Sequence, residues 1–83
     1  MRVLYFAWVR ERIGLAEEDL APPAEVGTAG ELVAWLARRG ENYAHAFERP
    51  ETIRVAVDRV HVAASAPIAG AREIALFPPM TGG

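Results

Sequence analysis

The residues best suited to chemistry stand at the end of the printed sequence, where Gly82 and Gly83 follow closely on two prolines. Pro78 and Pro79 fix their φ angles and lack N–H donors, which stops a strand and favours an extended chain beyond it. At about 3.3 Å per residue, the segment 78–83 can reach roughly 20 Å, enough to enter another protein's active site. No bulky side chain blocks its last two residues. The tail alone leaves two interpretations open, a functional carboxylate or a frayed end.

The rest of the chain offers little other chemistry. Cysteine and lysine are both absent, so thiolate nucleophiles, iron–sulfur ligation and Schiff-base chemistry are excluded, and any sulfur carried here must sit elsewhere. His45 and His61 lack the spacing of metal ligands, and no metal site is predicted. Ser65, the only serine, has no triad pattern with either histidine. The acidic run 17–19 is interpreted as a solvated face. A self-contained active site is not expected.

Length and charge narrow the class of protein. Eighty-three residues, 52% of them hydrophobic, suffice for one domain with one core. The net charge of −2 comes from nine basic and eleven acidic residues that are interspersed, which gives no basic field for nucleic acid. We find neither a membrane-spanning run nor a signal peptide pattern. We therefore expect a cytoplasmic protein that binds neither nucleic acid nor membrane.

The first half of the chain predicts two strands and a main helix. Thr28 and Glu31 form a capping box, and the apolar stripe that follows predicts a helix that ends at Gly40. Gly14 is expected to stop an earlier helical turn. The predicted elements are a strand over 2–8, a helical turn over 9–13, a second strand over 15–21, the main helix from 28 to 39 and a short helix over 41–47.

The second half predicts a hairpin and a last strand over 72–77. Strands over 53–57 and 60–62 flank a two-residue turn, Asp58-Arg59, and their valines are expected to face one core. This order predicts an α+β domain, residues 1–77, of β-grasp (ubiquitin-like) architecture: a mixed sheet with one main helix across it and short additional helices. In the first strand, Leu4, Phe6 and Trp8 share one face opposite Val3, Tyr5 and Ala7. One of the two sets is a candidate partner-binding patch, unless loops and the short helices bury both faces.

The tail and the opening segment of the sequence resemble those of a known family. The tail Leu76-Phe77-Pro78-Pro79-Met80-Thr81-Gly82-Gly83 is similar to that of the small subunits of molybdopterin synthase, which are ubiquitin-like sulfur carriers. The opening Val3-Leu4-Tyr5-Phe6-Ala7-Trp8-Val9-Arg10-Glu11 and the Val55-Ala56-Val57 hairpin support the likeness. Ala71-Arg72 departs from an acidic approach to the last strand that is common in the family, so no charged site residue is carried over.

The resemblance implies that Gly83 is the reactive residue, first as a glycyl adenylate and then as a thiocarboxylate (1-thioglycine). Gly82 and Thr81 would thread into the partner. An activating enzyme would use ATP, and this chain itself would bind no cofactor. The sulfur would pass to cyclic pyranopterin monophosphate in a catalytic pocket of the large subunit, within a heterotetramer of two small and two large subunits. The residues expected to grip partners at the root of the tail are Phe77, Pro78, Pro79 and Met80.

Other functions stay open. Carriers that supply sulfur for thiazole or for tRNA thiolation, and protein modifiers, also end in Gly-Gly but usually lack the Phe-Pro-Pro lead-in. A plain β-grasp interaction module with an inert tail is a further alternative.

Overall fold

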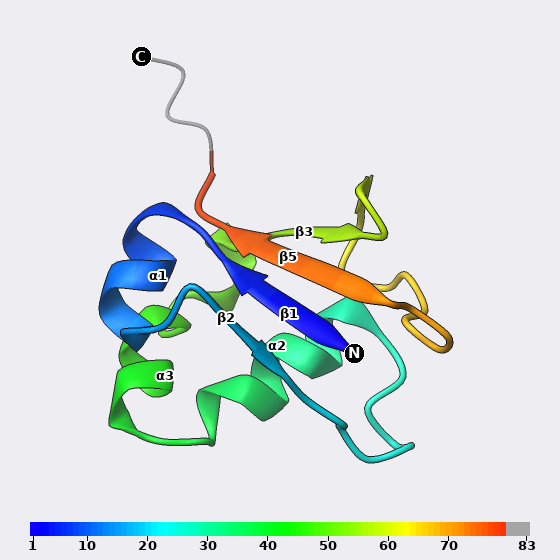
Figure 1. The fold of residues 1–83 in the computed structure, drawn as a ribbon, viewed down its shortest axis with the longest axis horizontal. Coiled ribbons are helices and arrows are strands. Elements are labelled where there is room, and N and C mark those ends of the chain that lie inside the picture. Colours follow the sequence, from blue (N-terminus) through cyan, green and yellow to red (C-terminus); the bar gives the residue numbers. More distant parts are fainter. Residues whose placement is uncertain (80–83) are drawn as a thin grey trace.

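The computed structural model describes residues 1–79, which form five strands, three α-helices and one 3-10 turn (Figure 1). Helices and strands alternate in the first half of the chain, and three strands fill the second. The elements are β1 (Arg2–Tyr5), α1 (Ala7–Ile13), β2 (Glu17–Asp19), α2 (Ala29–Ala37), α3 (Glu41–Ala46), η1 (Pro50–Thr52), β3 (Arg54–Val57), β4 (Val60–Val62) and β5 (Glu73–Phe77).

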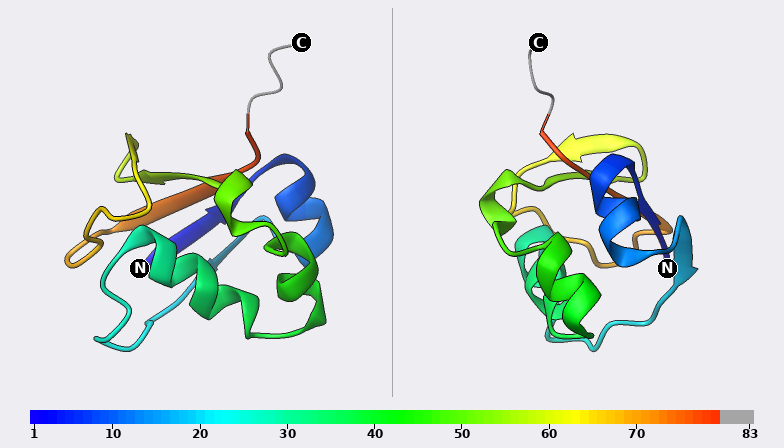
Figure 2. Two further views of the ribbon diagram at one scale, coloured as in Figure 1. Left: turned by 180° about the vertical axis from the view of Figure 1, so that it is seen from behind. Right: turned by 90° about the vertical axis from the view of Figure 1, so that its left-hand side faces the viewer.

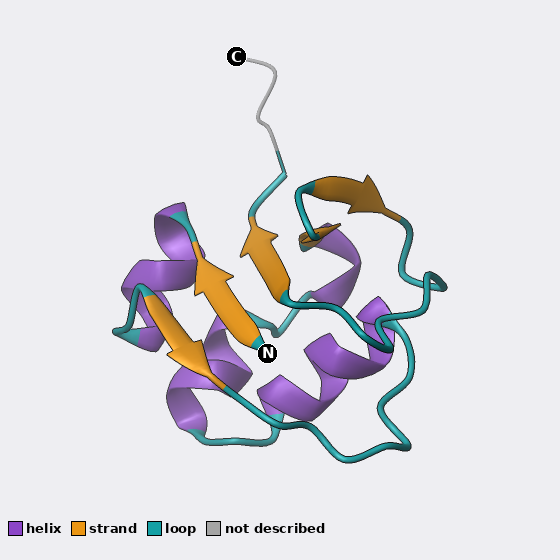
Figure 3. Cartoon of the chain, turned by 45° about the vertical axis from the view of Figure 1, so that its right-hand side comes forward, coloured by secondary structure: helices purple, strands orange, loops and turns teal. Residues whose placement is uncertain are grey.

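The strands form one mixed sheet in the order β2-β1-β5-β3-β4 (Figure 3). β1 and β5 pair in parallel, and every other neighbouring pair is antiparallel. β5, the last strand in the sequence, therefore lies in the centre, with hydrogen-bonded neighbours on both edges. The C-terminal segment leaves the sheet from its central strand. The strand that precedes this segment is therefore held by β1 on one side and by β3 on the other.

The core lies between the sheet and the helices, which cover one of its faces (Figure 2). α2 begins at the predicted capping box: the Thr28 hydroxyl accepts from the Glu31 N–H at 3.2 Å, and the Glu31 carboxylate accepts from the Thr28 N–H at 3.1 Å. Its apolar stripe then packs on the sheet. The buried side chains include Leu32 and Leu36 of α2 and Val3, Ile74 and Leu76 of the sheet.

The first strand is shorter than predicted, and α1 starts earlier. β1 ends at Tyr5, and the chain turns into α1 at Ala7, whose φ is +52°. The backbone explains the early start, because the Phe6 carbonyl accepts from the N–H groups of Val9 and Arg10, at 3.1 and 3.3 Å, and so closes the first turn of α1. The predicted stop at Gly14 is confirmed, with φ +91° and its N–H bonded to the Arg10 carbonyl at 2.8 Å.

The hairpin has the predicted pairing but not the predicted burial. Val57 and Val60 are register partners across the turn, as expected. Val60 is nevertheless 62% exposed, because β4 is the edge strand and the helices do not reach over it. The expectation that all valines of the hairpin face the core is therefore wrong for Val60.

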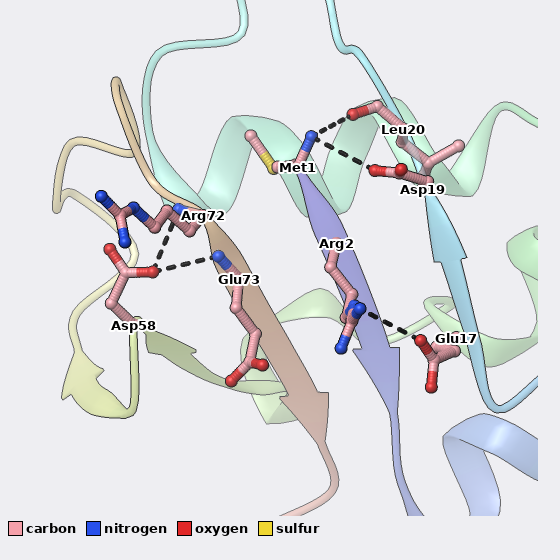
Figure 4. Close-up of polar contacts among 8 residues, drawn as sticks. All are labelled: Met1, Arg2, Glu17, Asp19, Leu20, Asp58, Arg72 and Glu73. Carbon is pink, nitrogen blue, oxygen red and sulfur yellow. Dashed lines mark hydrogen bonds and ion pairs between the residues drawn. The ribbon is translucent and has the colours of Figure 1, made fainter.

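Polar contacts hold the end of the sheet that lies opposite the outgoing tail (Figure 4). The Asp58 carboxylate accepts from the backbone N–H groups of Arg72 and Glu73, each at 3.0 Å, and so ties the hairpin turn to the start of β5. On the other side of the sheet, Arg2 of β1 pairs with Glu17 of β2 at 3.4 Å. The two Asp58 hydrogen bonds fix where β5 begins.

Glu18 corrects the interpretation of its acidic run as a solvated face. One carboxylate oxygen accepts from the hydroxyls of Tyr5, at 2.8 Å, and Tyr43, at 2.6 Å, while the other lies 3.5 Å from the Arg39 guanidinium. The Glu18 side chain is only 16% exposed. Burial, followed by the hydrogen bond to Glu18, raises the pKa of both tyrosines above the usual value. This cluster joins β1, β2, the turn after α2, and α3.

Candidate functional site

The predicted grip residues that the structure describes lie together at the end of β5. Leu76 is fully buried, and Phe77, Pro78 and Pro79 after it are half-buried, at the point where the chain leaves the domain (Figure 1). The segment 80–83, which holds the predicted Met80, Thr81, Gly82 and Gly83, lies outside the described residues. Its roles, and the division into a domain over 1–77 and a tail over 78–83, stay predictions.

Phe77 sits between an aromatic and a cationic neighbour. Its ring centroid lies 5.1 Å from that of the exposed His61, with the two rings tilted by 58°. Across the β3–β5 pairing its register partner is Arg54, which is exposed. The outward position expected for His61 is confirmed. Phe77 is thus braced from β4 and keeps part of its ring accessible beside the outgoing chain.

The sheet face away from the helices carries a row of small or apolar side chains. Leu4, Ala75 and Ala56 are consecutive register partners across β1, β5 and β3. The predicted face of Leu4, Phe6 and Trp8 is not formed, because only Leu4 lies on the strand. Phe6, 44% exposed, precedes α1, and its N–H bonds the Leu76 carbonyl at 3.1 Å, while Trp8 belongs to α1.

No catalytic cluster comes together within residues 1–79. In this range no three His, Cys, Asp or Glu side chains are grouped so that they could hold a metal ion. His45 lies exposed on α3, apart from His61. Every buried side-chain nitrogen or oxygen of the described chain has a hydrogen-bond partner. No helix there is long and apolar enough to cross a membrane.

One part of this region was not foreseen from the sequence. Pro79 lines a groove of about 330 Å³ together with Trp8 and Arg12 of α1 and with Arg49, which precedes η1. The four-residue spacing of Trp8 and Arg12 is the only signal of it, since it places both side chains on one face of a helix. Nothing in the sequence shows that Arg49 lies beside Trp8 and Arg12 in the folded chain.

A sheet that packs around one main helix and releases the chain from its central strand defines the ubiquitin-like, β-grasp class. Two solved structures share this fold. The crystal structure of SAMP1 from Haloferax volcanii has a TM-score of 0.72 and 24% identity, covering 100% of this chain and 98% of that one. A putative molybdopterin converting factor, subunit 1, from Pyrococcus furiosus has a TM-score of 0.73 and 23% identity, covering 95% of each chain. The predicted fold class is confirmed.

Within that class, the chain belongs to the ThiS family, whose model matches residues 3–83. Two curated relatives, from Haemophilus influenzae and Escherichia coli, are each a molybdopterin synthase sulfur carrier subunit. Both are 34% identical to this chain, over 87 and 83 residues respectively, and each alignment covers 100% of this chain and 99% of the relative. The family resemblance found in the sequence is confirmed.

Proposed function

We propose that this protein is the sulfur-carrying small subunit of molybdopterin synthase, and that Gly83 is its reactive residue. The observation that carries the proposal is the likeness to two such subunits, each 34% identical over 100% of this chain and 99% of the relative. The position of β5 supports it, because the central strand leads directly into Pro78 and Pro79. The domain would act as a sulfur donor within an enzyme complex.

The chemistry follows from the nature of a terminal carboxylate. With an ordinary pKa of about 3.3 to 3.7, it is ionised at neutral pH and resists nucleophilic attack. An activating enzyme would transfer AMP from ATP to Gly83, releasing pyrophosphate, and a sulfur nucleophile would then displace AMP to leave a thiocarboxylate. That sulfur would attack a carbon of cyclic pyranopterin monophosphate and displace an oxygen leaving group from it, and water would then cleave the thioester bond between the sulfur and the Gly83 carbonyl, so that the sulfur stays on the pterin. The carboxylate is thereby restored for another cycle.

The partners would divide the remaining work. The large subunit would supply the catalytic pocket, and the pair would assemble as a heterotetramer of two small and two large subunits in the cytoplasm. Leu4 and Ala75 of the row, with Phe6 and Phe77 at its end, offer a partly exposed apolar surface beside the tail, whereas Ala56 is buried. Gly83 and Gly82 would enter the pocket, since a glycine backbone passes where a Cβ atom would not, and Thr81 would follow them. This chain would bind no cofactor of its own.

Deletion of Gly83 tests the proposal. The purified chain is incubated with ATP, a sulfur source and the activating enzyme, and its intact mass is measured, followed by conversion of the pterin substrate with the large subunit. The full chain should exchange one oxygen for sulfur and support molybdopterin formation, and the deletion variant should do neither. Glu25→Gln, which changes an exposed side chain in the loop before α2, serves as the control. Product formation by the deletion variant would refute the proposal, and sulfur transfer only to a thiazole precursor or tRNA would favour another carrier.

A further inference from the structure

The groove beside Pro79, called here the tail-root groove, lies between α1 and η1. It holds about 330 Å³ and is lined by Trp8, Arg12, Glu48, Arg49 and Pro79, among others. α1 follows the end of β1 directly, so it lies at the end of the sheet where the chain leaves β5 (Figure 1). This groove is separate from the apolar row on the open face of the sheet.

Arg12, on one wall of the groove, already has partners within the domain. The Arg12 guanidinium stacks over the Trp8 ring at 4.3 Å from its centroid and lies 3.8 Å from a Glu48 carboxylate oxygen. One of its nitrogens also donates to the His45 carbonyl at 3.3 Å. Arg12 and Glu48 therefore neutralise each other, and the Trp8 ring is held in place as an apolar wall.

With Arg12 and Glu48 paired, Arg49 supplies the positive charge of the groove. Its side chain is exposed, and within residues 1–79 no carboxylate lies within 4 Å of its guanidinium. Its backbone is fixed, because its carbonyl accepts from both the N–H and the hydroxyl of Thr52, at 2.9 and 2.7 Å. The groove thus presents one cation from a rigid turn, next to an apolar wall.

The tail determines which protein can occupy this groove. Pro79 is both a wall of the groove and the residue from which the chain continues toward Gly83. At about 3.3 Å per residue, the four following residues span roughly 13 Å, so the protein that receives the tail must also lie over the groove. We propose that an acidic segment of the large subunit docks there, its carboxylate paired with Arg49 and an adjacent apolar side chain packed against Trp8 and Pro79. This inference rests on the proposed function, which makes the large subunit the receiver.

Charge reversal at Arg49 tests the inference. Binding of the full chain to the purified large subunit is measured by titration calorimetry at low and high salt. Arg49→Glu should raise Kd by about 10-fold or more, since it replaces an attraction by a repulsion, and most of the difference should vanish at high salt. Arg49→Lys should stay close to wild type. Arg38→Glu, which changes the net charge equally but lies at the end of α2 on another groove, should change Kd by less than about 2-fold.

Three results would overturn the inference: unchanged binding of Arg49→Glu, equal losses in Arg49→Glu and Arg38→Glu, or a loss confined to the activating enzyme. The melting temperature of Arg49→Glu should match wild type, because the side chain is exposed. Failure of the proposed function is distinguishable, because wild type would then neither gain sulfur at Gly83 nor bind the large subunit. Wild type that does both, with no specific defect in Arg49→Glu, refutes only the docking site.

Discussion

Replacing Glu18 by glutamine should destabilise the domain by about 2 kcal/mol. The carboxylate accepts from the hydroxyls of Tyr5 and Tyr43 at 2.8 and 2.6 Å. A hydrogen bond to a charged group contributes about 1.5–3 kcal/mol and a neutral one about 0.5–1.5, so each of the two bonds should lose about 1 kcal/mol. Glutamine keeps the shape of the side chain, but it also removes the negative charge opposite the Arg39 guanidinium, 3.5 Å away.

Urea denaturation and thermal melting measure this loss. In a domain of this size, 1 kcal/mol corresponds to about 4–8 °C, so the melting temperature should fall by about 8–16 °C. Glu17→Gln is the matched control at the neighbouring position. Glu17 pairs with Arg2 at 3.4 Å, but the two side chains are 54% and 60% exposed, and its loss should cost less than about 0.5 kcal/mol. Equal free energies of unfolding for the two variants would refute the assignment of Glu18 as a buried structural acceptor.

Three further predictions concern the same framework. Asp58→Ala should cost about 1–2 kcal/mol in urea denaturation, because it removes the acceptor of two backbone N–H groups and places alanine at φ +48°, while Asp58→Asn should cost clearly less. Thr28→Ala should cost about 1 kcal/mol by losing the cap of α2, seen as a lower urea midpoint with an unchanged slope. Because folding raises the pKa of Tyr5, its contribution to stability is complete below about pH 10 and declines by up to about 1.4 kcal/mol per pH unit as the pH rises toward the folded value. Tyr5→Phe should flatten that alkaline decline, and an unchanged slope would contradict it.

Local signals in the sequence predicted several elements well. The Thr28–Glu31 pair marks the start of α2, because a capping box satisfies backbone donors without help from the rest of the fold. Asp58-Arg59 marks the hairpin turn, where both residues adopt positive φ. The Gly-Gly tail with its proline lead-in pointed to the family. For the capping box, the determining contacts lie within three residues along the chain.

Tertiary contacts decided what the sequence could not show. Residues 7 and 8 fit either a strand or a helix, and the long-range hydrogen bond from the Phe6 N–H to the Leu76 carbonyl of β5 holds the chain where it turns into α1. Glu18 looked like part of an exposed acidic run, because nothing local indicates that the hydroxyls of Tyr5 and Tyr43 converge on it. Alternation along β2 would have suggested that the middle residue of the run points inward.

The central position of β5 has a mechanical consequence. A partner that grips the chain beyond Pro79 pulls along β5, whose backbone is hydrogen-bonded to β1 on one edge and to β3 on the other. Such a load acts parallel to the strand and is shared by two rows of hydrogen bonds in shear, whereas an edge strand pulled sideways would separate one bond at a time. The domain can thus serve as a handle that stays folded while the chain beyond it is held and released.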